Sequence, residues 1–277
     1  MILPKKISKY YKSIKFFTIV LFAVLLLLAS VQTSVHLKKE RISKDYQTLS
    51  SFNPEDIIYY QKISPHSWKE SIAIISAIKH YSEVEIINPE EIYNKLTMEL
   101  TDNNKLAQLN WTSIDKNIKK LTFYYYKILN KYPIYSPNEF FFPVERPSYY
   151  TDTYGAAREG GKRLHEGVDL FDKKGTKIIS VCSGKVEKIG WNRLGGERVG
   201  VRGNDGCYYY YAHLDMINEQ LYVGKKIRKG ELIGTMGNTG DAITTPDHLH
   251  FGIELPNGDW VNPYPFLKVW EFNQFQK

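Results

Sequence analysis

Three hydrophobic patterns follow one another along the chain. An uncharged apolar run covers residues 16–31, apolar positions recur with a helical period over 52–131, and short apolar runs separated by glycine occupy 135–270. These patterns are typical of a membrane-spanning helix, of packed helices and of β-strands joined by tight turns. We therefore predict an α+β protein, with an N-terminal transmembrane helix, a small helical region and a C-terminal, all-β antiparallel domain.

The apolar run at 16–31 reads FFTIVLFAVLLLLASV. As a helix it is about 24 Å long, and with Ile14 and a snorkelling Lys15 it approaches the ~30 Å hydrocarbon core of a bilayer. Five Lys precede the run and two follow it closely, which predicts a cytoplasmic tail at 1–15 and an extracytoplasmic remainder. A cleaved signal peptide has a similar pattern, but Ala29-Ser30-Val31 fits a cleavage site poorly, so we expect a single-pass membrane anchor rather than secretion.

Charge supports this topology. Residues 1–39 contain seven Lys and no Asp or Glu, and the 30 remaining basic residues equal the 30 acidic ones. The net charge of +7 is thus confined to the neighbourhood of the apolar run. Because the rest of the chain is formally neutral, we expect no nucleic-acid partner.

Residues 32–51 are polar, which predicts a stalk. Several helix-start signals follow and divide residues 52–131 into separate predicted helices. Two of these starts have an Asn N-cap, a Pro at the first helical position and acids in the first turn. The region has no metal-ligating or nucleophilic cluster. Three roles stay open for it: it could dock an unidentified protein partner, hold the C-terminal domain at a distance from the membrane, or cover the groove of that domain. The predicted starts are Asn53-Pro54, Ser64-Pro65, Asn88-Pro89 and a helix over 113–131.

Two histidine motifs in the last domain have the spacing of a metal site. His248 and His250 lie two apart in the strand-like run HLHFGIEL, so they share one face. His165 and Asp169 also share a face if that segment is extended, and Gly167 between them leaves room for an ion. One His and one Asp, joined by a later His, give three ligands and an open position, which is the catalytic zinc arrangement.

A further histidine, His213, ends a tyrosine-rich run at 208–211. In a regular strand it shares a face with Tyr209 and Tyr211. A histidine that faces a metal-bound water can orient it or accept its proton. The two cysteines, Cys182 and Cys207, lack the spacing of a thiolate zinc site; they are either a disulfide or, as we prefer, two small buried hydrophobes.

Taken in order, these motifs resemble the lysostaphin/LytM-type zinc peptidases over about residues 140–268. The resemblance implies the duplicated hybrid motif β fold and a groove for extended peptides. It also implies one Zn²⁺ per chain, held by His165, Asp169 and His250, with His213 and His248 as the catalytic pair. The matching segments are His165-x-Gly167-x-Asp169, Tyr211-Ala212-His213-Leu214 and His248-Leu249-His250-Phe251, with Asp247 inserted where the family has Pro directly before its HLH motif.

The implied activity is zinc-dependent hydrolysis of peptide bonds in cell-wall peptidoglycan, in a stem peptide or a cross-bridge. Zinc lowers the pKa of bound water toward ~7, and a histidine then relays the proton to the leaving amine. Which of His213 and His248 acts as base is left open. The anchor followed by helices also looks like the sporulation L-Ala–D-Glu endopeptidases of spore-forming Gram-positive bacteria.

Two other classes of function compete with the peptidase. The first is a catalytically inactive envelope scaffold or activator of the same fold. The presence of all five site residues argues against this class, because its members lack metal ligands. The second is a wall-binding module, favoured only by the tyrosines at 208–211, which are common in strands for other reasons.

Overall fold

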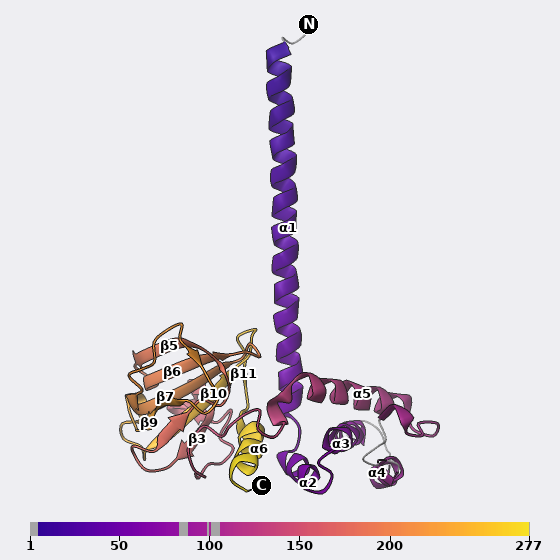
Figure 1. The fold of residues 1–277 in the computed structure, drawn as a ribbon, viewed down its shortest axis with the longest axis vertical. Coiled ribbons are helices and arrows are strands. Elements are labelled where there is room, and N and C mark those ends of the chain that lie inside the picture. Colours follow the sequence, from indigo (N-terminus) through magenta and orange to yellow (C-terminus); the bar gives the residue numbers. More distant parts are fainter. Residues whose placement is uncertain (1–4, 83–87, 99, 101–105, 277) are drawn as a thin grey trace.

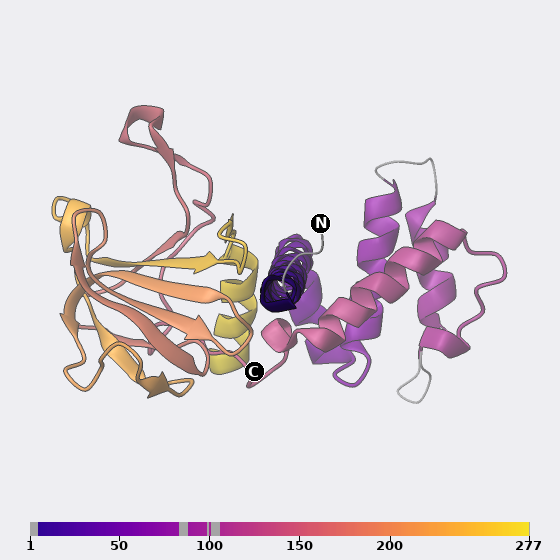
Figure 2. The same cartoon turned by 90° about the horizontal axis from the view of Figure 1, so that it is seen from above.

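A computed structural model describes residues 5–82, 88–98, 100 and 106–276. The long helix α1 (Lys5–Ser50) ends between two lobes, one made of helices and one built on a β-sheet (Figures 1 and 2).

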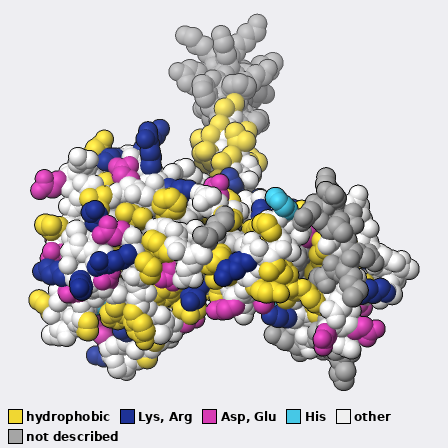
Figure 3. Space-filling model, turned by 60° about the horizontal axis from the view of Figure 1, so that its bottom comes forward, with side chains coloured by type: hydrophobic (Ala, Val, Ile, Leu, Met, Phe, Trp, Pro, Cys, Tyr) yellow, Lys and Arg dark blue, Asp and Glu magenta, His cyan; other side chains and the backbone are white. Residues whose placement is uncertain are grey.

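Helix α1 is continuous, so the stalk predicted at 32–51 is a prolongation of the apolar helix rather than a separate segment. From Val20 onward the helix is long and apolar enough to cross a membrane, a property that membrane spans share with signal sequences. Its apolar side chains are exposed there, as Figure 3 shows above the lobes. Its last turns, in contrast, bury Tyr46 and Leu49 against the folded part of the chain.

The helical lobe follows its predicted starts at Asn53-Pro54 and Asn88-Pro89, whereas the helix predicted from Ser64-Pro65 begins only at Trp68. The Asn53 side chain accepts a hydrogen bond from the backbone N–H of Asp56 at 2.8 Å and caps the first helix of the lobe. The helix predicted from residue 113 begins three residues later, because Asp115 caps it by accepting from the N–H of Asn117 at 2.7 Å. The elements are α2 (Pro54–Ile63), α3 (Trp68–Ser82), α4 (Pro89–Met98), η1 (Leu106–Gln108), α5 (Lys116–Lys131) and η2 (Pro133–Tyr135).

The second lobe contains an antiparallel sheet, as the glycine-punctuated pattern predicted. Within residues 106–276 this sheet has nine strands, with the order β11-β10-β7-β6-β5-β8 and with β3 paired to β10 and β9 joining β4 to β7. A separate two-stranded ribbon precedes it. The bounds are β1 (Ala157–Arg158), η3 (Glu159–Gly161), β2 (Arg163–Leu164), β3 (Val168–Phe171), β4 (Lys177–Ile179), β5 (Gly184–Asn192), β6 (Gly196–Gly203), β7 (Tyr208–Ile217), β8 (Lys226–Ile227), β9 (Leu232–Met236), η4 (Gly240–Ala242), β10 (His248–Glu254), β11 (Trp260–Val261) and α6 (Tyr264–Phe275).

The prediction of an all-β domain to residue 270 is wrong at its end, where α6 is helical. This helix buries apolar side chains on several of its faces, so its sequence lacks the single apolar stripe that marks an amphipathic helix. Trp270 donates from Nε1 to the carbonyl of Ile134 at 2.7 Å and ties α6 to the segment that leaves the helical lobe.

Contacts of the last turns of α1 fix the sheet beside this helix. The hydroxyls of Tyr46 and Tyr209 each donate to Oδ2 of Asp205 at 2.6 Å, and the Tyr135 hydroxyl donates to the carbonyl of Leu49 at 2.7 Å. Nearby Cys182 and Cys207 are buried free thiols. The β lobe is therefore docked on the end of α1 and does not hang from a loose linker.

Candidate metal centre and peptidase groove

Strand β10 presents two histidines on one face because strand side chains alternate. His250 lies opposite Asp169 of β3, and His248 lies opposite Phe171. Leu249 between them is fully buried on the other face, in the core of the sheet. The structure therefore confirms that the two histidines lie on the same face of the strand, as predicted.

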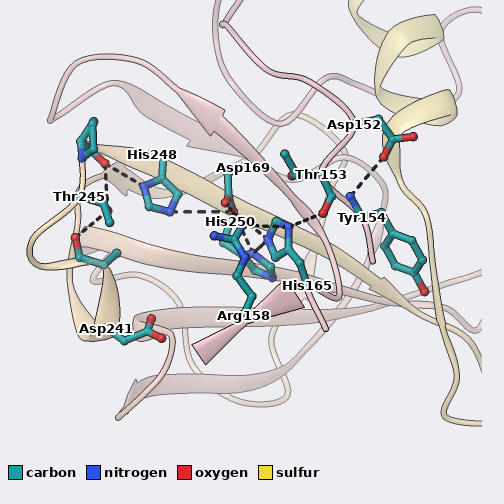
Figure 4. A network of polar contacts seen from close by, with 12 residues as sticks. Asp152, Thr153, Tyr154, Arg158, His165, Asp169, Asp241, Thr245, His248 and His250 are labelled. Carbon is teal, nitrogen blue, oxygen red and sulfur yellow. Dashed lines mark hydrogen bonds and ion pairs between the residues drawn. The ribbon is translucent and has the colours of Figure 1, made fainter. Parts of the chain in front are cut away.

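Three donor atoms from three different segments meet beside β10. The Nε2 atom of His165 lies 3.0 Å from Oδ1 of Asp169 and 2.9 Å from Nδ1 of His250, which is itself 3.1 Å from the same oxygen (Figure 4). Donors bound to one tetrahedral zinc at 2.0–2.1 Å are about 3.3 Å apart, so this set needs only small shifts to hold one ion. Of the described residues, these three form the group of His, Cys, Asp and Glu side chains close enough to share a metal.

The electrostatics of the cluster suit a cation. Burial opposes ionisation of Asp169, but hydrogen bonds with His165 and His250 outweigh it and hold the pKa of the carboxyl well below its usual range. Burial lowers the pKa of His250 and favours its neutral form. An ionised carboxylate beside the neutral imidazole of His250 is the protonation state in which these two groups bind metal.

A second pair of histidines lies beside this cluster. Nδ1 of His213 hydrogen-bonds the carbonyl of Thr239 at 2.7 Å, and Nδ1 of His248 hydrogen-bonds that of Pro246 at 2.8 Å. Because carbonyls only accept, both Nδ1 atoms carry the proton, and both Nε2 atoms are left as acceptors when the rings are neutral. The ring centroids are 4.8 Å apart, and Nε2 of His248 lies 3.9 Å from Oδ1 of Asp169.

Comparison with known proteins identifies the domain. Residues 163–263 match the profile of peptidase family M23. The L-Ala–D-Glu endopeptidase of Bacillus subtilis is 34% identical over 212 residues, which are 70% of this chain and 65% of that protein. The chain contains a peptidase M23 domain.

Two further comparisons define how far the likeness extends. Lysostaphin of Staphylococcus simulans is 35% identical to this chain over 128 residues, which are 44% of this chain and 25% of that protein. The crystal structure of a proposed glycyl-glycine endopeptidase lytM from Ruminococcus gnavus covers 80% of this chain and 88% of its own, with a TM-score of 0.55. At 23% identity that structure shows a shared fold alone. The chain thus spans less than two thirds of either curated relative.

His213 of the M23 domain does not share a face with Tyr209 and Tyr211, and that prediction is wrong. The two tyrosines are fully buried in the core, whereas His213 lines the groove. The cause is its backbone, which has a φ of 61° and so leaves the regular strand conformation. Its N–H donates to the carbonyl of Gly195 at 2.7 Å, which holds this conformation. Burial and the charges of His248 and His250 lower its pKa to about 4.

Gly167 leaves room for a ring and not, as predicted, for the ion. A Cβ on this residue would lie 2.6 Å from Cε1 of His250 and 2.5 Å from the carbonyl oxygen of Phe251. The absence of a side chain at Gly167 therefore lets the His250 imidazole reach the cluster.

Two residues of the site were not predicted from the sequence. Thr153 accepts a hydrogen bond from Nδ1 of His165 at 2.9 Å, which leaves Nε2 of that ring free to face the cluster. Arg158, on the β1–β2 ribbon, donates to Oδ2 of Asp169 at 2.6 Å (Figure 4). Neither belongs to a motif, and they precede His165 by twelve and seven residues, so no local signal marks them.

The cluster opens into a groove on the sheet. A cavity of about 360 Å³ contains the cluster with His213 and His248, and a neighbouring cavity of about 570 Å³ extends over β6 and β7. Both include His213 and His250, so they form one continuous site. The inserted Asp247 lies outside the described lining of either cavity.

Proposed function

We propose that the chain is a zinc-dependent endopeptidase that hydrolyses peptide bonds of cell-wall peptidoglycan. The proposal assigns one Zn²⁺ to His165, Asp169 and His250, and proton handling to His213 and His248. The observation that carries it is the convergence of two imidazoles and one carboxylate, 2.9–3.1 Å apart, at the end of an open groove. Membership of a metallopeptidase family supports the same chemistry.

Bound zinc would supply a Lewis acid and an activated water. The chain's own residues do the rest. The Nε2 atoms of His213 and His248 are acceptors near the cluster and are suited to taking a proton from the attacking water and returning it to the leaving amine. Anchoring of both Nδ1–H groups by backbone carbonyls fixes the tautomer and the ring orientation that this relay requires.

The stem peptide is the better candidate for the substrate. The relative that acts on L-Ala–D-Glu aligns with 70% of the chain, whereas lysostaphin aligns with 44%. We propose on this basis that the cut bond is L-Ala–D-Glu. The role in sporulation is a proposal of the same kind, and a sporulation defect after gene deletion in the native host tests it.

We also propose that residues 16–31 anchor the protein in the membrane with both lobes outside. The exposed apolar surface of α1 and the seven Lys of residues 1–39 support this arrangement. Retention in the membrane pellet after alkaline extraction, with the lobes open to added protease in intact protoplasts, is expected. A shorter, soluble protein in the culture medium would show cleavage instead.

Digestion of purified peptidoglycan by the full chain in detergent, followed by mass spectrometry of the muropeptides, tests the activity and identifies the bond. We expect new N-terminal D-Glu products that vanish with a chelator and return with Zn²⁺. Protein that binds no zinc and releases no muropeptide would instead support the inactive scaffold.

A further inference from the structure

Strand β6 directs a cation into the groove. Val199 and Val201 are fully buried in the core, and strand alternation places Arg198 on the opposite face, where it lines the larger cavity. Lys188, on the neighbouring strand β5, lines the same cavity.

Two tyrosines of β7, Tyr208 and Tyr210, line the same cavity as Arg198. The Tyr208 ring lies across Gly200, where any Cβ would overlap it, and the Tyr210 hydroxyl lies over Gly195 in the same way. Burial raises the pKa of both phenols, and the positive charge of Arg198 opposes the rise in each. Arg198 and both tyrosines line the same cavity, so the guanidinium lies on the face of the sheet that carries the two rings.

The charge of Arg198 lacks a partner within the described residues. Two neighbouring cations are paired with carboxylates: Arg163 lies 2.8 Å from Asp241, and Arg202 lies 2.7 Å from Glu187. The exposed Arg193, which also lines the cavity, makes no ion pair with a described carboxylate either, but it is open to solvent. Arg198 and Lys188 make no ion pair with any described carboxylate, and Nε of Arg198 is buried without a hydrogen-bond acceptor. Leaving a partly buried cation unpaired is unfavourable, so a ligand carboxylate would find a strong and unsatisfied donor here.

The position of Arg198 relative to the cluster limits where that carboxylate is on the substrate. β10, β7 and β6 are consecutive neighbours in the sheet, so β6 is two strands from His250. At about 4.8 Å per strand this is ~10 Å, the length of three residues of an extended peptide. A group bound by Arg198 is therefore within about three residues of the cleaved bond.

We propose that Arg198, assisted by Lys188, binds a free carboxylate of the substrate and selects acidic stem peptides over neutral oligoglycine. This inference rests on the proposed endopeptidase function. In a γ-linked D-Glu residue the free α-carboxylate is such a group, and its amidation to D-isoglutamine removes the charge while keeping the shape. A guanidinium binds a carboxylate with two parallel hydrogen bonds, which an amide cannot match.

The test compares the full chain in detergent with its Arg198→Gln variant on two matched peptides, L-Ala–γ-D-Glu–L-Lys and its α-carboxamide. Charge-assisted hydrogen bonds contribute about 1.5–3 kcal/mol, so kcat/KM of the native protein should favour the acid by about 10-fold to 100-fold. Arg198→Gln should remove this preference by lowering kcat/KM for the acid alone, and Arg198→Lys should retain part of it. Arg228→Gln, which removes an exposed charge outside the groove, is the control.

Equal cleavage of both peptides by the native protein, or an equal loss on both peptides in Arg198→Gln, would overturn the inference and leave the endopeptidase intact. Failure of the zinc-loaded native protein to cut either peptide or whole peptidoglycan would instead overturn the proposed function. In that case equilibrium binding of the two peptides to the metal-free protein still tests the carboxylate site. Tighter binding of the acid that is lost in Arg198→Gln would support the site, and equal binding of the two peptides would refute it.

Discussion

The guanidinium of Arg158 lies 2.6 Å from Oδ2 of Asp169, while Oδ1 of the same carboxylate points at His165 and His250. One carboxylate oxygen is thus fixed by the β1–β2 ribbon, and the other faces the two histidines of the cluster. Groups that hydrogen-bond metal ligands in this way orient them and commonly change metal affinity 10–100-fold when removed.

Arg158→Gln is therefore expected to weaken zinc binding about tenfold, because Asp169 loses the contact that fixes its orientation. Competition with a chromogenic chelator measures the affinity. Arg163→Gln is the matched control, since Arg163 belongs to the same ribbon but pairs with Glu159 and Asp241. Unchanged or tighter zinc binding in Arg158→Gln would show that the guanidinium does not position the ligand.

Substitutions within the five-residue site should separate into two classes. His165→Ala, Asp169→Ala and His250→Ala each remove one donor of the cluster and should abolish stoichiometric zinc binding. His248→Ala should keep the metal but lose turnover, because His248 lies beside the cluster and not within it. Metal content by atomic emission and muropeptide release by mass spectrometry distinguish the classes. Full activity of metal-free protein would contradict the whole scheme.

Gly167→Ala should damage the site by steric overlap. Its Cβ would meet the His250 ring and the backbone of Phe251 at 2.5–2.8 Å, neither of which can move without disturbing β10. Gly175→Ala is the control: its φ of +86° is strained for alanine, but no atom lies within 4 Å. We expect Gly175→Ala to cost about 1–2 kcal/mol of stability with zinc binding intact, and Gly167→Ala to lose zinc binding. Similar behaviour of the two variants would argue against the overlap.

Local patterns carried most of what could be predicted. The shared face of His248 and His250 follows from strand alternation alone, and the Asn53 cap needs only one side chain and the backbone N–H three residues later. Such features depend on neighbours in the sequence, so periodicity and capping rules suffice.

What the sequence did not reveal depends on contacts between distant segments. The left-handed backbone of His213 is held by the carbonyl of Gly195 on the adjacent turn, and no local signal marks a histidine for that conformation. Arg158 reaches Asp169 only because the β1–β2 ribbon folds back over the cluster. The helix α6 was missed because its all-round burial removes the stripe that marks a helix.

The lowered pKa of His213 has a consequence for stability in the metal-free protein. Its pKa is about 4 when folded, against 6.5 for an unperturbed histidine. Between these values the unfolded state binds more protons than the folded state, so this residue makes stability rise with pH from about 4 to 6.5. Each proton contributes a slope of at most about 1.4 kcal/mol per pH unit. Acidification across this window should therefore destabilise the β lobe.

His213→Asn removes the titrating group while tolerating a positive φ. In chelator-treated protein, the fall in Tm between pH 6.5 and pH 4.5, followed by tryptophan fluorescence, should be smaller for His213→Asn than for the native chain. His66→Asn, a substitution at an exposed histidine of the helical lobe, should leave the native pH dependence unchanged. Parallel pH curves for His213→Asn and the native protein would mean that His213 titrates alike in the folded and unfolded states, and that burial does not hold this ring neutral for proton transfer.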